Sequence, residues 1–355
     1  MDFKKTLSAR VDRRKLLRNL GVVGAGAVLT ACGPRGITPP PDNGNGNGAA
    51  NLDAAILNFA LNLEYLEAAF YLAVVGRLSE LPGGDADIVL PAGYDPSPGS
   101  SLYPAVGPID NPIAEYAQEL ADDELNHVVF LRNALQGAGA PVAERPVINL
   151  ADSFEAAASV AFAGVTDPSA LGLPADFTPA DFNPFANDPF FLHGAFIFED
   201  VGVSAYHGAA EFITDPAFLR AAAGILAVEA YHSGSIRTQL YAADMRRADF
   251  FGGLDTWSIV NAISNARDSL NPGVDNDQGV VGNPNFPESL AHEGPDGLGA
   301  NIVPGDQNSI TIPRTPRQVA NIVYLGVDTA SGGFFPDGIS IPAGLEDDFA
   351  TLLGL

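Results

Sequence analysis

Residues 124–127 read ELNH and residues 229–232 read EAYH. In both stretches a glutamate precedes a histidine by three positions: Glu124 precedes His127, and Glu229 precedes His232. Residues three apart lie on the same face of an α-helix, so each pair can reach one point in the interior of a helical bundle. This repeated pattern decides the fold that we predict.

Apolar residues recur at steps of three and four over four long segments, which predicts four helices with buried faces. The predicted segments are residues 51–78, 110–136, 188–213 and 215–247. The last three begin with Asp or Asn followed by proline, a sequence typical of helix starts. We therefore expect an all-α fold, a four-helix bundle. Residues 79–109 and 138–187 are long and rich in Pro and Gly, so they are expected to cross over the bundle, with a short helix near residues 154–163.

The other two helices also carry acids within apolar sequence, and these complete a candidate metal site. The first helix carries Glu64 and Glu67, and the third carries Glu199. One glutamate from each of two helices, with a Glu-x-x-His pair from each of the other two, is the ligand set of a di-metal carboxylate bundle. Two divalent ions would balance four carboxylates. The predicted ligands are Glu64, Glu124, His127, Glu199, Glu229 and His232.

Carboxylate and imidazole ligands suit iron and manganese and do not choose between them. The competing interpretation is that each Glu-x-x-His is a solvent-exposed pair on a helix surface, as isolated instances of this short motif are. Four further residues are expected beside the ligands or in the core rather than on the metal: Glu67, Tyr71, Tyr206 and His207.

The first 32 residues have the features of an export signal. A basic stretch precedes a short apolar run, residues 20–31, which ends at Cys32. Arg13-Arg14 resembles a twin-arginine signal, and residues 29–32 resemble a bacterial lipobox with Cys32 as the lipidated residue. We expect an exported protein of the bacterial cell envelope or periplasm, held at the membrane by lipid on Cys32. An uncleaved anchor helix is the alternative. Residues 33–50 are expected to be a flexible linker.

Composition narrows the choice of partners. The formal net charge is −25, with 18 Lys and Arg against 43 Asp and Glu, which argues against nucleic acid. The single cysteine excludes a cysteine-based zinc site. The predicted partners are the membrane, metal ions, a small oxidant and, in a dimer, a second copy of the chain.

The helical segments resemble the ferritin-like superfamily, and within it the group that includes desiccation-associated proteins. Asn62-Leu63-Glu64 with Tyr71 resembles the first ferritin helix, which favours Glu64 over Glu67 as a ligand. The resemblance assigns the two Glu-x-x-His pairs to the second and fourth helices and Glu199 to the third. Residues 198–206 and 315–319 resemble the narrower group.

The resemblance implies a ferritin-like bundle over residues 51–250, followed by a loop-rich C-terminal extension, residues 251–355, packed on it. In the extension we expect helices near residues 255–270 and 315–324 and an aromatic turn at 332–336. The expected function is di-metal redox chemistry, of oxidase, ferroxidase or peroxidase type, in oxidative or desiccation stress. The alternative is a non-catalytic stress-protection scaffold. The crossovers and the extension argue against a closed storage cage.

Overall fold

The computed structural model describes residues 47–104, 111–244, 253–282 and 299–354. The expected signal with Cys32, and the expected linker up to residue 46, lie outside the described residues. The all-α prediction is confirmed: helices are the main regular structure of the described part, and its strands are two of two residues each. Its helices are too short or too polar to cross a membrane.

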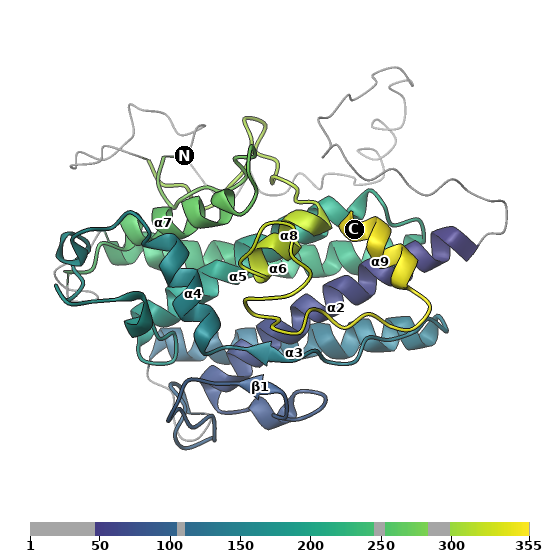
Figure 1. Cartoon of the computed structure of the whole chain (residues 1–355), viewed down its shortest axis with the longest axis horizontal. Helices are drawn as coiled ribbons and strands as arrows, with labels where there is room; N and C mark the ends of the chain where they lie inside the picture. Colours follow the sequence, from purple (N-terminus) through teal and green to yellow (C-terminus); the bar gives the residue numbers. More distant parts are fainter. Residues whose placement is uncertain (1–46, 105–110, 245–252, 283–298, 355) are drawn as a thin grey trace, which may run out of the picture. The chain divides into compact units, whose positions relative to one another are not determined.

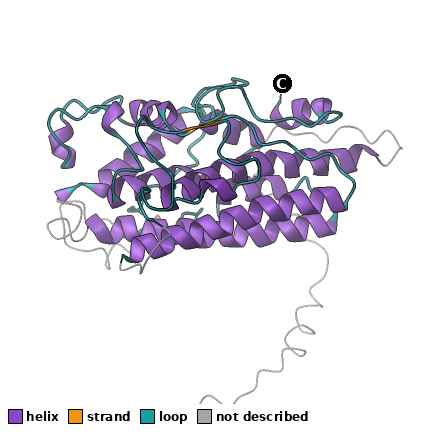
Figure 2. Cartoon of the chain, turned by 90° about the horizontal axis from the view of Figure 1, so that it is seen from below, coloured by secondary structure: helices purple, strands orange, loops and turns teal. Residues whose placement is uncertain are grey.

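Four long helices form the bundle (Figure 1): α2 (Asn47–Val75), α3 (Pro112–Gly137), α5 (Asp188–Ala210) and α6 (Pro216–Asp244). Helix α2 packs mainly on α3, and α5 packs mainly on α6. Figure 2 shows the long helices running side by side, with most of the loops on one side of them. Because α2 begins at Asn47, the last four residues of the expected linker belong to this helix.

Local sequence accounts for where these helices begin. The side chain of Asn111 accepts a hydrogen bond from the backbone N–H of Ile113, and that of Asn187 accepts one from Phe190, in each case next to an early proline. Such caps satisfy backbone donors that have no partner within the helix. Asp215 caps α6 in the same way through the N–H of Ala217. Only a few residues separate α5 from α6, so these two helices are antiparallel neighbours, as predicted.

The two crossovers meet each other on the bundle. The first contains the 3₁₀ segment η2 (Leu78–Glu80) and strand β1 (Ile88–Val89). The second contains β2 (Ile148–Asn149), α4 (Asp152–Ala161), η3 (Pro168–Leu171) and η4 (Pro179–Asp181). Strands β1 and β2 pair in parallel, with Ile88 opposite Ile148. The short helix α4 lies close to where the sequence predicts it.

The C-terminal extension packs against the bundle. It contains α7 (Thr256–Ser269), α8 (Pro316–Val323) and α9 (Glu346–Leu353); the sequence did not indicate α9. The side chain of Asn62 on α2 exchanges two hydrogen bonds with the backbone of Ser340, of 2.7 and 3.0 Å. The ring of Phe334, in the predicted aromatic turn, lies 5.0 Å from that of Phe198 on α5. The extension therefore contacts the two helices that carry Glu64 and Glu199.

A buried set of ion pairs, which we call the arginine–aspartate network, also joins the extension to the bundle. Its members are Asp200, Arg237, Arg267, Asp277 and Arg314, all at most 8% exposed. Asp200 pairs with Arg237 at 2.7 Å and with Arg267 at 3.2 Å. Asp277 pairs with Arg267 at 2.5 Å and with Arg314. The network ties α5, α6 and α7 to the segment that precedes α8.

Candidate metal centre

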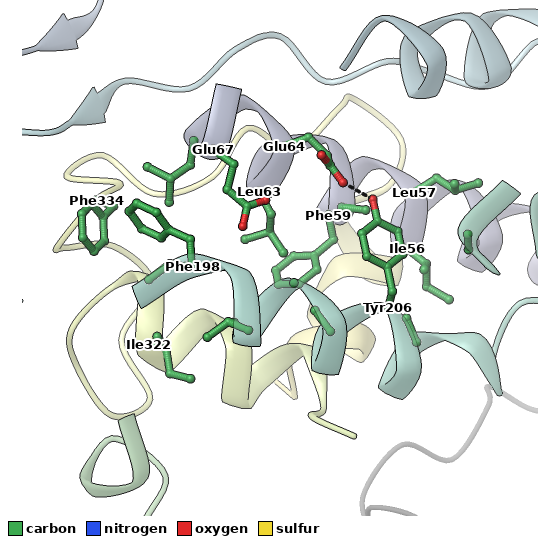
Figure 3. Close-up of a pocket in the computed structure, with 18 of the residues that line it drawn as sticks. Ile56, Leu57, Phe59, Leu63, Glu64, Glu67, Phe198, Tyr206, Ile322 and Phe334 are labelled. Carbon is green, nitrogen blue, oxygen red and sulfur yellow. Dashed lines mark hydrogen bonds between the residues drawn. The ribbon is translucent and has the colours of Figure 1, made fainter. Parts of the chain in front are cut away.

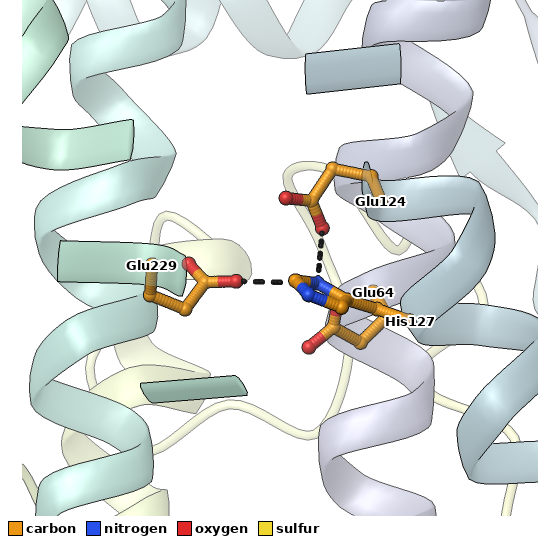
Figure 4. A group of neighbouring side chains, drawn as sticks. All are labelled: Glu64, Glu124, His127 and Glu229. Carbon is orange, nitrogen blue, oxygen red and sulfur yellow. Dashed lines mark hydrogen bonds and ion pairs between the residues drawn. The ribbon is translucent and has the colours of Figure 1, made fainter. Parts of the chain in front are cut away.

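The four long helices bring the six predicted ligands together in the bundle interior. Their donor atoms form two groups, within each of which all atoms lie within 4.8 Å of one another. The first group combines Glu64, Glu124, His127 and Glu229 (Figure 4), and the second combines Glu124, Glu199 and His232. Glu124 belongs to both groups, so one carboxylate connects two adjacent candidate metal positions.

His127 lies at the middle of the first group. Its Nδ1 lies 3.1 Å from Glu64 Oε2 and 3.2 Å from Glu124 Oε2. The distance from Nδ1 to Glu229 Oε1 is 3.6 Å. Three carboxylates from three helices thus converge on one imidazole nitrogen, and these three glutamates are at most 1% exposed.

His232 has the equivalent place in the second group. Its Nδ1 lies 3.0 Å from Glu124 Oε1 and 3.4 Å from Glu199 Oε2. Its other ring nitrogen, Nε2, lies 3.1 Å from Asp123 Oδ2. A carboxylate on the far nitrogen of a metal-binding histidine fixes the orientation of the ring. Asp123 is positioned to do this for His232.

Several donor atoms of the centre have no hydrogen-bond partner in the described part of the chain. Both side-chain oxygens of Glu229 make no hydrogen bond to a described residue, and Glu124 Oε1, Glu199 Oε2 and His232 Nδ1 lie against one another without hydrogen-bond geometry. Buried polar atoms without partners are rare because their desolvation is not repaid. All of these atoms are ligand types that iron and manganese accept. The donor set therefore fits a pair of divalent cations, which would supply the missing partners.

The backbone of α5 leaves room for the Glu229 side chain. A Cβ atom placed on Gly202 would lie 2.1 Å from Glu229 Oε2, closer than non-bonded atoms can approach. Any side chain at position 202 would therefore push this carboxylate out of its place. Gly202 is part of the site although it carries no ligand atom.

Two buried tyrosines hold carboxylates of the centre from across the bundle. Tyr71 on α2 donates a hydrogen bond to Glu199 Oε1, and Tyr206 on α5 donates one to Glu64 Oε1. Both were expected beside the ligands. His207 instead lies 2.8 Å from the hydroxyl of Thr311 in the C-terminal extension, and it belongs to neither ligand group.

Burial and crowding of like charges change the pKa values of the acids. Burial raises the pKa of Glu64 to about 7, although His127 opposes this. Burial, reinforced by the neighbouring glutamates, raises the pKa of Glu229 well above its usual value. Burial likewise raises the pKa of Glu67, which is 5% exposed and is in neither ligand group. Without a cation these acids therefore tend to keep their protons.

The pKa values of the shared carboxylate, Glu124, and of His127 shift in the directions expected for ion pairs. Burial disfavours the charged form of Glu124, but its contacts with His127 and His232 outweigh this and lower its pKa. Burial would lower the pKa of His127, but Glu64 and Glu124 raise it to about 11. In the metal-free protein, protons on the histidines and acids thus balance the negative charge that bound cations would otherwise balance.

Comparison with known proteins agrees with this geometry. Residues 52–242 match the family model described as a ferritin-like domain, which is more than half of the chain. The chain belongs to this ferritin-like family. It is 30% identical to a desiccation-related protein, PCC13-62, of Craterostigma plantagineum over 75% of each chain. It is 26% identical to the ferritin-like catalase Nec2 of Nesocodon mauritianus, over 88% of this chain and 91% of that one. No solved structure matches the chain.

Sequence reasoning missed two residues that the geometry singles out. Asp123 directly precedes Glu124, and its part as the partner of His232 depends on how α3 and α6 pack. Gly202 lies inside an apolar helix, where glycine is unfavourable, and this was a signal of a close approach.

Proposed function

We propose that the protein is a di-metal redox protein that holds two iron or manganese ions and disproportionates hydrogen peroxide. The observation that carries the proposal is the pair of buried ligand groups that share Glu124 and leave donor oxygens without partners. Their composition matches the two-carboxylate, two Glu-x-x-His set of di-metal bundles. Glu64 and Glu199 would each belong to one position, with His127 and His232 as the histidine ligands.

Two redox-active ions at the centre would supply the two-electron chemistry that peroxide disproportionation needs. In this reaction one hydrogen peroxide is oxidised to dioxygen and gives up two protons and two electrons. A second hydrogen peroxide takes these up and becomes two water molecules, so no outside reductant is required. The similarity to a protein named ferritin-like catalase supports this choice of reaction.

The chain's own residues have distinct tasks in this proposal. Tyr71 and Tyr206 orient the carboxylates of Glu199 and Glu64 by donating hydrogen bonds to them. Asp123 orients His232. Burial excludes bulk water and strengthens each of these interactions.

We further propose that the protein acts outside the cytoplasm, anchored by lipid on Cys32, in protection against oxidative or drying stress. The basic and apolar character of residues 1–32 supports export. The similarity to a protein named desiccation-related supports a stress role. That name also favours the alternative, a non-catalytic protective scaffold, which predicts protection without peroxide turnover.

Oxygen release from hydrogen peroxide, followed with an oxygen electrode, tests the reaction. Full-length protein loaded with iron or with manganese should release one dioxygen for every two peroxides consumed. Replacement of the shared carboxylate, Glu124→Gln, should abolish the release. Glu119→Gln, at an exposed position on the same helix, is the matched control and should leave it intact. A fully loaded protein that releases no dioxygen would contradict the proposal and favour the scaffold.

A further inference from the structure

A cavity lies next to the metal centre, and the proposed reaction at the centre does not account for it. It lies between α2, α5 and α8, and its volume is about 730 Å³ including the open space at its mouth. Figure 3 shows its walls, which are almost entirely apolar and include Phe59, Phe198, Ile322 and Phe334. This lining favours the hydrocarbon part of a ligand.

The inner wall of the cavity is shared with the metal centre. Glu64, a predicted ligand, and Tyr206, its hydrogen-bond donor, both line it. Gly202, which lies against Glu229, lines it as well. A molecule bound in the cavity would therefore lie directly beside the ligands of the first metal position.

Glu67 supplies a polar group at this inner wall. Its carboxyl group points into the cavity (Figure 3), and only 5% of the residue is exposed. It makes no hydrogen bond to any residue in the described ranges of the chain. A bound ligand with a hydrogen-bonding group could therefore pair with this carboxyl group, which faces the cavity.

The lining also indicates which end group a ligand should have. It contains no Lys, Arg or His, so a buried carboxylate head would face two glutamates with no positive partner. A hydroxyl group is both a donor and an acceptor, and it matches a carboxyl group in either protonation state. We propose that the cavity binds a neutral aliphatic molecule that ends in an O–H group, with the chain along the apolar walls and the O–H group at Glu67. This goes beyond the proposed peroxide chemistry and does not depend on it.

The probe for the test is octanol, with octanoate as an anionic probe of the same chain length. Both are titrated calorimetrically into metal-loaded full-length protein. We expect saturable binding of octanol and, because an unpaired buried carboxylate is costly, octanoate binding weaker by at least about tenfold. Glu67→Leu should weaken octanol binding severalfold, because the O–H group loses its partner.

A variant that fills the cavity tests whether octanol binds there. Ala209 on α5 and Ala60 on α2 are half-buried and line the cavity, so Ala209→Phe should fill its mouth and abolish octanol binding. Ala227→Phe, at an exposed position on α6, is the control and should bind as the unchanged protein does. If Ala209→Phe does not fold, Ala60→Phe replaces it.

Any of three results would overturn the proposal: no binding of octanol, equal binding of octanoate, or full binding by a folded blocking variant. Peroxide turnover is measured separately on the same preparations. A failure of octanol to bind would therefore leave the proposed function untouched, and an inactive centre would leave the cavity proposal untouched.

Discussion

The metal centre and the arginine–aspartate network are both buried charged clusters, and they share helices α5 and α6. In the network every carboxylate oxygen has a partner: Ser233 and two arginines for Asp200, and two arginines for Asp277. In the centre, the four predicted glutamate ligands have only two histidines as positive partners in the described part of the chain, and Glu229 Oε2 has neither a hydrogen bond nor an ion pair there. Burial alone therefore does not indicate a metal site, whereas buried ligand atoms without partners do.

The pKa values of two buried acids, Asp200 and Glu229, show the same contrast. Burial raises the pKa of Asp200, but Arg237 and Arg267 outweigh it, and the net shift is downward. Burial raises the pKa of Glu229 and neighbouring glutamates raise it further. The acids of the network thus have positive partners within the protein, whereas the acids of the centre outnumber their two histidines and need cations to balance their charge.

The largest effect should follow from removing the carboxylate that both ligand groups share. Glu124→Ala should reduce the affinity for both metals by more than about a hundredfold, the loss seen when groups that merely support ligands are removed. Elemental analysis after dialysis measures it. Glu119→Ala, exposed on the same helix, should keep its metal. Full metal content in Glu124→Ala would refute the shared position.

A substitution in the arginine–aspartate network should change the stability of the protein and not its metal binding. Asp277→Ala removes the carboxylate that pairs with Arg314 and leaves Arg267 with Asp200 alone, and it should lower the free energy of unfolding by about 3–5 kcal/mol. Chemical denaturation should give the same loss with and without metal. The exposed Asp275→Ala is the control, at less than about 0.5 kcal/mol. A loss seen only in loaded protein would erase the distinction between the two clusters.

A smaller effect is expected where the chain only makes room for a ligand. Gly202→Ala would displace Glu229 and should weaken metal binding by about 10–100-fold. Gly224→Ala, on an exposed part of α6 with open space around it, should instead raise stability by about 0.5–1 kcal/mol. Competition with a metal-binding dye measures the metal affinity of both variants, and chemical denaturation measures their stability. Unchanged binding in Gly202→Ala would mean that Glu229 is not a ligand.

The smallest effect, taken per pH unit, is the pH dependence of the stability of the metal-free protein. Glu64 and His127 have folded pKa values of about 7 and about 11, above the usual 4.5 and 6.5. The folded state therefore binds more protons than the unfolded state, and stability should fall as pH rises from about 5 to 8, by up to about 1.4 kcal/mol per pH unit for each proton. Because metal replaces these protons, stabilisation by metal should grow over the same range. Denaturation curves at several pH values measure both trends, and a metal-free protein more stable at pH 8 than at pH 5 would contradict them.

The sequence predicted the elements of the fold that depend on local periodicity. The four long helices, α4, α7 and α8 lie close to their predicted positions, because apolar spacing and helix caps are local signals. The two Glu-x-x-His pairs lie in the predicted ligand groups because residues three apart share a helix face.

What could not be predicted depends on contacts between distant segments. The network joins Asp200 to Arg314 through Arg267 and Asp277, and no local pattern marks such pairs. His207 follows Glu199 by eight residues, which turns it by about 80° around the helix axis, toward the extension rather than the centre. Tyr71 and Tyr206 each bind a glutamate of the other's helix, which follows from helix packing and not from spacing.

The most direct test of the central claim is the metal content of full-length protein purified without chelator. The account predicts about two equivalents of iron or manganese per chain, one for each ligand group. Less than about 0.2 equivalents of any transition metal, in protein that also fails to take up added iron or manganese, would contradict it.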